Sequence, residues 1–213
     1  MAVIWIVLGV VVLVAIAGVI SYNRFVTQKN LIKDAWANID TELRRRYDLI
    51  PNLVETVKGY ASHESEIFEE VARTRSMASG ATGTPAAQAA AEGPFMAALG
   101  KLFAVAEAYP DLKANQNFLA LQTELSNTED RLQTARRFYN ANVREFNTRL
   151  QAFPSSIMAG MFHFEPAEFF EIPDAIREAG PPQVDFSTPA GSVAPPAPPA
   201  PEAPPTPPTP PSG

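Results

Sequence analysis

A stripe of mostly apolar side chains runs from residue 118 to residue 153, with one member at every third or fourth position. This spacing places the side chains along one face of a single helix, because an α-helix has 3.6 residues per turn. At 1.5 Å per residue the helix would be roughly 50 Å long, and it needs partner helices to bury the stripe. The stripe consists of Phe118, Leu121, Leu125, Thr128, Leu132, Ala135, Tyr139, Asn142, Phe146, Arg149 and Phe153.

A second stripe of the same kind predicts a helical region from residue 22 to about residue 77. Pro51 lies inside it and predicts a kink or a tight restart, with Asp48 as a cap for the restarted segment. The stripe keeps its phase across Pro51, which argues against a long loop. It consists of Ile32, Trp36, Ile39, Leu43, Ile50, Leu53, Val57, Tyr60, Ile67 and Val71, with Arg46 and Glu64 at the two remaining steps.

The stretch between these two regions predicts one further helix and its loops. Residues 79–85 are small and lack apolar anchors, so we expect an exposed loop. Residues 86–109 favour a helix that is interrupted at Gly93-Pro94, and its first part, 86–92, could stay loose. A turn follows at residues 109–112, where Asp111 is a candidate cap for the long helix.

Residues 2–20 are uncharged and almost wholly apolar. As a helix they would span about 28 Å, close to the roughly 30 Å hydrocarbon core of a bilayer. We therefore predict an uncleaved transmembrane anchor at residues 1–22 that contacts the lipid bilayer through residues 2–20. A signal peptide cleaved after Ala17, and a buried core helix, are the alternatives. Arg24, Lys29 and Lys33 follow the span, and the positive-inside rule then places the N-terminus outside and the rest in the cytoplasm.

The C-terminal part of the chain changes composition twice. Phe153-Pro154 ends the long helix, and residues 155–172 are rich in Phe and Met. They predict a segment folded back over the helices, or a lip that contacts the membrane or a partner. From Pro181 onward lie 14 of the 21 prolines, so we expect a disordered Pro-rich tail at residues 181–213. The tail could be a spacer or a ligand for a proline-binding groove.

Composition, charge and residue spacing argue against several classes of binding site and catalytic site. Cysteine is absent, and the net charge of -6 speaks against a nucleic-acid partner. The Glu-x-x-His pairs of di-iron bundles do not occur, since Tyr60 precedes His63 by three positions and Gly160 precedes His163. The sequence contains no recognisable catalytic, metal-binding or cofactor-binding motif, so the chain is predicted not to be an enzyme and to need no cofactor.

Six residues form the candidate surface for partner choice or helix register: Arg44, Arg45, Arg46, Tyr139, Asn142 and Arg149. The three consecutive arginines could bind anionic lipid or phosphate, or could be a solvated face that pairs with nearby acids. Asn142 and Arg149 interrupt the apolar stripe, and polar residues in a seam often set register. Tyr139 and its neighbour Asn140 could line a groove or form internal hydrogen bonds, and the same holds for Phe146 and Asn147.

The chain resembles the LemA family. The resemblance lies in residues 39–54 (IDTELRRRYDLIPNLV), 57–60 (VKGY), 107–115 (EAYPDLKAN) and 135–140 (ARRFYN), with Phe146-Asn147 and Phe153-Pro154. These stretches are spread in order over roughly residues 22–170. The resemblance implies an all-α bacterial inner-membrane protein, with one N-terminal span and an up-and-down bundle of about four helices at residues 23–180. It implies no established activity, and the proximity of such genes to membrane-protease genes hints at envelope quality control.

Together these features predict a membrane-anchored helical scaffold that recruits a protein partner of unknown identity at the inner membrane. A homo-oligomer is a further option. The alternatives are a bundle enzyme or a small-molecule or lipid-binding protein with an unrecognised carboxylate or arginine site, and a secreted bundle released by cleavage.

Overall fold

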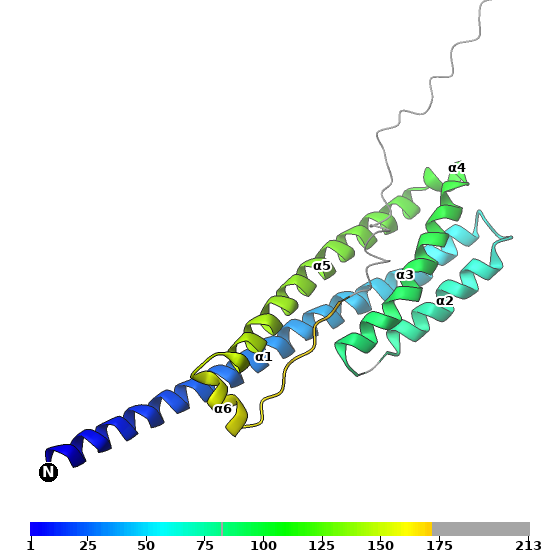
Figure 1. The fold of residues 1–213 in the computed structure, drawn as a ribbon. Coiled ribbons are helices and arrows are strands. Elements are labelled where there is room, and N and C mark those ends of the chain that lie inside the picture. Colours follow the sequence, from blue (N-terminus) through cyan, green and yellow to red (C-terminus); the bar gives the residue numbers. More distant parts are fainter. Residues whose placement is uncertain (82, 172–213) are drawn as a thin grey trace, which may run out of the picture. The chain divides into compact units, whose positions relative to one another are not determined.

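The computed structural model describes residues 1–81 and 83–171. The chain divides into two units, residues 1–182 and 183–213, and the second unit lies wholly outside the described residues. The predicted disorder of residues 181–213 therefore falls outside them too. The described residues form six helices, α1 Ala2–Lys58, α2 Ser65–Ser79, α3 Pro85–Glu107, α4 Pro110–Lys113, α5 Gln116–Gln151 and α6 Ser155–Met161 (Figure 1). The predicted all-α bundle is confirmed.

Helices α1 and α5 form the central pair of the first unit (Figure 1). They run antiparallel, since Gln28 of α1 bonds to Glu145 of α5 whereas Arg46, further along α1, bonds to Glu129. Helices α2 and α3 pack on each other beside the C-terminal part of α1. Their apolar faces and most of the seam between α1 and α5 bury the main core, and Phe25, Phe146 and Ala159 form a second, smaller cluster where α1, α5 and α6 meet.

Helix α1 is unbroken over 57 residues, or roughly 85 Å, and contains Pro51 in its interior. Of the two predicted outcomes at Pro51, a kink or a restart capped by Asp48, the restart is excluded, because one helix continues through the proline with Ile50 and Leu53 buried on either side of it. The chain instead turns back between Gly59 and Glu64, inside the region predicted as helical. Tyr60 is 41% exposed there and accepts a hydrogen bond from Asn115, so its place in the stripe was a coincidence of spacing.

Helix α3 passes through Gly93-Pro94 without interruption, which corrects the prediction of a break. Thr84 caps its N-terminus by accepting a hydrogen bond from the Ala87 amide, and Pro85 occupies the first turn, where a missing donor costs little. Asn115, and not Asp111, caps α5: its side chain accepts from the amides of Asn117 and Phe118.

Helix α5 confirms the predicted long helix and ends at Gln151. Phe153 lies beyond its end and is 83% exposed, so it is not part of the buried stripe. After α6 the chain continues without regular structure from residue 164 to residue 171. This segment returns along α1, where the Phe164 ring stacks on Phe25 and the Phe170 ring packs edge-on against Trp36. The predicted fold-back is thus confirmed for this half of the aromatic segment.

Two helices are long and apolar enough to cross a membrane, judged by length and composition over the described residues. The apolar window of α1 is not buried at all, whereas half of the window in α3 is buried inside the bundle. Burial identifies α3 as a core helix. The exposed apolar side chains of residues 3–20 leave α1 as the segment suited to a bilayer.

Candidate functional site

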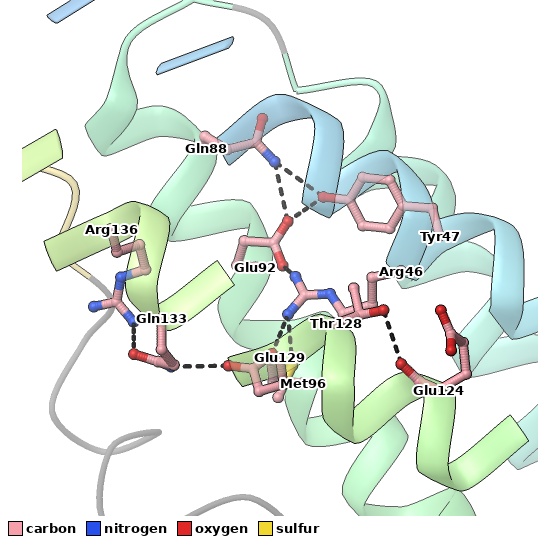
Figure 2. Close-up of polar contacts among 10 residues, drawn as sticks. All are labelled: Arg46, Tyr47, Gln88, Glu92, Met96, Glu124, Thr128, Glu129, Gln133 and Arg136. Atoms are coloured by element: carbon pink, nitrogen blue, oxygen red, sulfur yellow. Dashed lines mark hydrogen bonds and ion pairs between the residues drawn. The ribbon is translucent and has the colours of Figure 1, made fainter. Parts of the chain in front are cut away.

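The centre of the bundle contains a buried polar network, drawn in Figure 2. Arg46 occupies a core position of α1 and is 1% exposed. Its guanidinium donates to Glu92 of α3 and to Glu129 of α5, with Nη1 3.1 Å from Glu129 Oε2. One arginine thereby joins three helices.

The carboxylate of Glu92 accepts further hydrogen bonds from two neighbouring side chains. The Tyr47 hydroxyl donates to Oε1, and Gln88 Nε2 lies 3.0 Å from the same oxygen and 3.1 Å from the Tyr47 hydroxyl oxygen (Figure 2). Gln88 also donates to the Ala78 carbonyl of α2. These bonds satisfy a carboxylate that is entirely removed from solvent.

The network extends along α5 through Glu129, which accepts from Gln133 Nε2 at 2.8 Å. Gln133 in turn accepts from Arg136 Nη1 at 3.2 Å, and the Arg136 guanidinium lies 5.6 Å from the Phe170 ring centroid. Figure 2 shows Glu129 between Arg46 on one side and Gln133 on the other. The polar chain therefore links the centre of the bundle to the segment 164–171.

Burial shifts the pKa values of Arg46 and Tyr47 in opposite directions. Desolvation lowers the pKa of Arg46, and the neighbouring Glu129 carboxylate opposes that shift. Burial raises the pKa of Tyr47, and the Arg46 charge opposes it. At neutral pH the arginine remains a cation, because guanidinium groups are not deprotonated in proteins, and the phenol, whose pKa burial raises, remains protonated and donates. Both groups are thus in the form that stabilises the Glu92 carboxylate.

The centre of the network is closed to substrates in this structure. Arg46 and Glu92 are buried, and neither side chain lines the open clefts around Arg44 and around Arg144. Among residues 1–81 and 83–171, no group of three or more His, Asp or Glu side chains is placed to hold a metal ion. The arrangement fixes the mutual register of α1, α3 and α5, which is a structural role.

The structure separates the three consecutive arginines. Arg46 is buried, so it cannot belong to an exposed partner surface. Arg44 and Arg45 are exposed, and Arg44 Nε pairs with Asp40 Oδ2 at 2.9 Å on the same helix. Both line an open cleft of about 620 Å³ whose walls also carry the carboxylates of Asp40, Asp48 and Glu124.

The other three candidates lie in different places on α5. Tyr139 is buried, and its hydroxyl donates to the Glu168 carbonyl at 2.8 Å. Asn142 lies outside the seam and donates to the Phe138 carbonyl of its own helix, because Val143 takes the buried position. Arg149 is near the C-terminal end of α5, beside Glu145. The six predicted residues do not form one surface.

Two asparagines of α5 hold the returning segment through paired backbone hydrogen bonds. Asn140 donates to the Phe170 carbonyl and accepts from the Phe170 amide, at 3.1 and 2.9 Å. Asn147 does the same for Ala167, with both distances 2.9 Å. Seven residues separate the asparagines, or two helical turns, so both face the segment. We call these four bonds the asparagine ladder.

The LemA family model matches residues 35–186, which is most of the chain. The chain belongs to the LemA family. Its apolar N-terminal helix and this membership make it a membrane-associated helical protein.

Curated relatives of this LemA-family chain include magnetosome proteins. Magnetosome protein MamQ 2 of Paramagnetospirillum magneticum is 29% identical over 176 residues, covering 70% of this chain and 64% of the relative. Magnetosome protein MamQ of Magnetospirillum gryphiswaldense is 27% identical over 175 residues, with the same coverage. Protein LemA of Metamycoplasma hominis is 26% identical over 137 residues, covering 64% of this chain and 63% of the relative. The chain thus spans just under two thirds of these relatives, whose names denote no enzymatic activity.

Proposed function

We propose that this LemA-family protein is a membrane-anchored scaffold that recruits a protein partner at the inner membrane. The observation that carries the proposal is the continuity of α1 from Ala2 to Lys58. The same helix supplies the apolar N-terminal segment and the core residues of the bundle, so no flexible joint separates the two. A bundle held in this way presents a fixed face to a partner at a fixed distance from the bilayer.

The charges beyond the apolar segment support a cytoplasmic bundle with the N-terminus outside. Arg24, Lys29 and Lys33 are all exposed on the first turns of α1 that follow residue 20. Cations in this position are retained on the cytoplasmic side during insertion.

The partner surface we propose is the cleft lined by Arg44 and Arg45. It lies between α1 and α5 and carries both signs of charge, with Asp40, Asp48 and Glu124 beside the arginines. Mixed charges of this kind fix the register of a polar segment from a partner and reject apolar surfaces. Arg45 is about 36 Å beyond residue 21 along the helix, well clear of the lipid headgroups.

Site-specific photo-crosslinking in native membranes tests this proposal. A photoreactive amino acid replaces Arg44 or Arg45 in the full chain, and the matched control carries it at Arg131, an exposed arginine of α5 outside the cleft. We expect one membrane protein to be crosslinked in stoichiometric amounts from positions 44 and 45 and not from position 131. Intact protein in the membrane without any reproducible crosslink at 44 and 45 would contradict the proposal.

A further inference from the structure

A second cleft lies at the opposite end of the central helix pair, where α1 leaves its apolar segment. It is open and has a volume of about 790 Å³. Ala17 and Ile20 of α1 and Ala152 beyond α5 give it an apolar part. The polar part is formed by the guanidinium-bearing side chains Arg24, Arg144 and Arg149, with Glu145.

The charge of this cleft differs in sign from that of the cleft around Arg44. Three arginines face one glutamate here, whereas two arginines face three carboxylates in the other cleft. Glu145 is also engaged by Gln28, whose Nε2 lies 2.7 Å away, and Arg149 Nη2 approaches it only to 3.4 Å. Arg149 Nε is buried without a hydrogen-bond partner among the described residues. The cleft therefore has an excess of positive charge and a buried donor that lacks an acceptor.

Neighbouring contacts place the cleft at the level of a bilayer surface. Helix α6 packs beside Gly18, where an added Cβ would lie 3.5 Å from Met158 Cε, so α6 touches the apolar segment 2–20 itself. The Phe162 ring lies 4.7 Å from the ring of Tyr22, and aromatic rings favour the membrane interface. Exposed apolar side chains continue across this end of the bundle at Phe153, Ile157 and Met161.

We propose that this cleft binds the phosphate headgroup of an anionic phospholipid. Arg24, Arg144 and Arg149 surround the phosphate, and the buried Nε of Arg149 gains its missing acceptor. Ala17, Ile20 and Ala152 contact the glycerol and the first methylene groups, so the apolar part of the cleft continues into the bilayer. Arginine suits this task because its planar fork donates two parallel hydrogen bonds to phosphate oxygens. The inference depends on the membrane anchor and is independent of the protein partner.

Native mass spectrometry of the full chain in neutral detergent micelles provides the test. Phosphatidylglycerol and phosphatidylcholine with identical acyl chains are titrated separately, and inorganic phosphate is titrated in a third arm. We expect preferential retention of phosphatidylglycerol. Arg24→Gln and Arg144→Gln should each weaken that binding about fivefold, the effect of one cation near an anionic lipid surface. Both arginines are exposed, so the substitutions leave the core intact.

The matched control is Arg45→Gln, which removes the same charge from the other cleft and should leave lipid binding unchanged. Three results would overturn the inference: equal retention of the two lipids, an equal loss in Arg45→Gln, or binding of inorganic phosphate without binding of phosphatidylglycerol. Circular dichroism of each variant verifies that the helical content is retained, so a loss of lipid reflects the cleft itself.

Discussion

Arg46 of α1 pairs with Glu92 of α3 at the centre of the bundle, and their side chains are 2% and 0% exposed. Removing two charges from water is costly, and their attraction offsets that cost only when the remaining donors and acceptors are also satisfied. Tyr47, Gln88 and Glu129 supply those additional bonds. The pair can form only when α1 and α3 have one relative register, so it selects a single packing of the bundle.

Arg46→Ala is expected to destabilise the bundle by about 3–5 kcal/mol, because it leaves the buried Glu92 carboxylate without its cation. Guanidinium unfolding of the full chain in neutral detergent, followed by circular dichroism, measures the change. Arg45→Ala is the matched control, since its exposed side chain should contribute within about 0.5 kcal/mol. Equal losses in the two variants would contradict a buried pair at position 46.

Arg46 and Glu92 should also be energetically coupled. The double variant Arg46→Ala/Glu92→Ala is expected to lose less stability than the sum of the two single variants, by about 1–3 kcal/mol. The reason is that the first substitution already removes the interaction that the second would break. The same unfolding measurement on all four chains gives the coupling energy, and strict additivity would mean that the two side chains act independently.

The asparagine ladder should control the attachment of residues 164–171. Asn147→Ala removes the acceptor of the Ala167 amide and the donor to its carbonyl, and we expect a cost of about 1–3 kcal/mol. Hydrogen exchange should accelerate at the Ala167 amide in this variant and at the Phe170 amide in Asn140→Ala. These two amides report the ladder directly.

Asn142→Ala is the control for both ladder variants. It gains the same helix propensity from alanine but loses only a bond to its own helix, so its stability should be unchanged or slightly raised. Unchanged exchange at Ala167 and Phe170 in the two ladder variants would show that the asparagines do not hold the segment.

Tyr139 should make stability sensitive to strongly alkaline pH. Burial, with a smaller contribution from the Glu168 carboxylate, raises the pKa of Tyr139 to about 12, compared with about 10 in an unfolded chain. The neutral phenol is thus favoured by folding, and its contribution is fully present below about pH 10 and lost as the pH rises through 12. The free energy of unfolding should fall more steeply between pH 10 and 12 in the natural chain than in Tyr139→Phe. Parallel curves would contradict the assigned shift.

Local periodicity predicted the parts of the fold that depend on one helix at a time. The apolar stripe through Leu125, Leu132 and Phe146 identified α5. The three-to-four-residue spacing of the second stripe placed Arg46 on the core face of α1. Spacing alone could not locate the turn at Gly59, because the positions of Ile67 and Val71 happened to continue the phase of the preceding helix. Pro51 suggested a kink or a restart and Gly93-Pro94 an interruption, but both helices continue through their prolines, with buried residues packed on both sides of each.

Which side chains pair with the buried charges depends on which helices pack against each other, and a single sequence does not reveal these helix–helix contacts. Glu92 was missed, although it lies three residues before Phe95 on the apolar face of α3. A cation in the stripe of α1 requires a buried acid elsewhere, and that requirement was the available signal. Asn140 and Asn147 are candidates for internal hydrogen bonds on the sequence alone. Both asparagines bond to backbone N–H and C=O groups, which every non-proline residue has, so the sequence alone does not identify Ala167 and Phe170 as their partners.

The central claim is that the apolar N-terminal part of α1 lies in the bilayer whereas the rest of the same helix belongs to the bundle outside it, and cysteine accessibility tests this placement most directly. The chain has no cysteine, so Val11→Cys and Glu55→Cys introduce single reactive sites into the full chain. In sealed, inverted membrane vesicles, whose cytoplasmic face is turned outward, a membrane-impermeant maleimide should label position 55. It should spare position 11 until detergent is added. Labelling of position 11 at the same rate as position 55, or loss of position 11 from the mature protein, would contradict the claim.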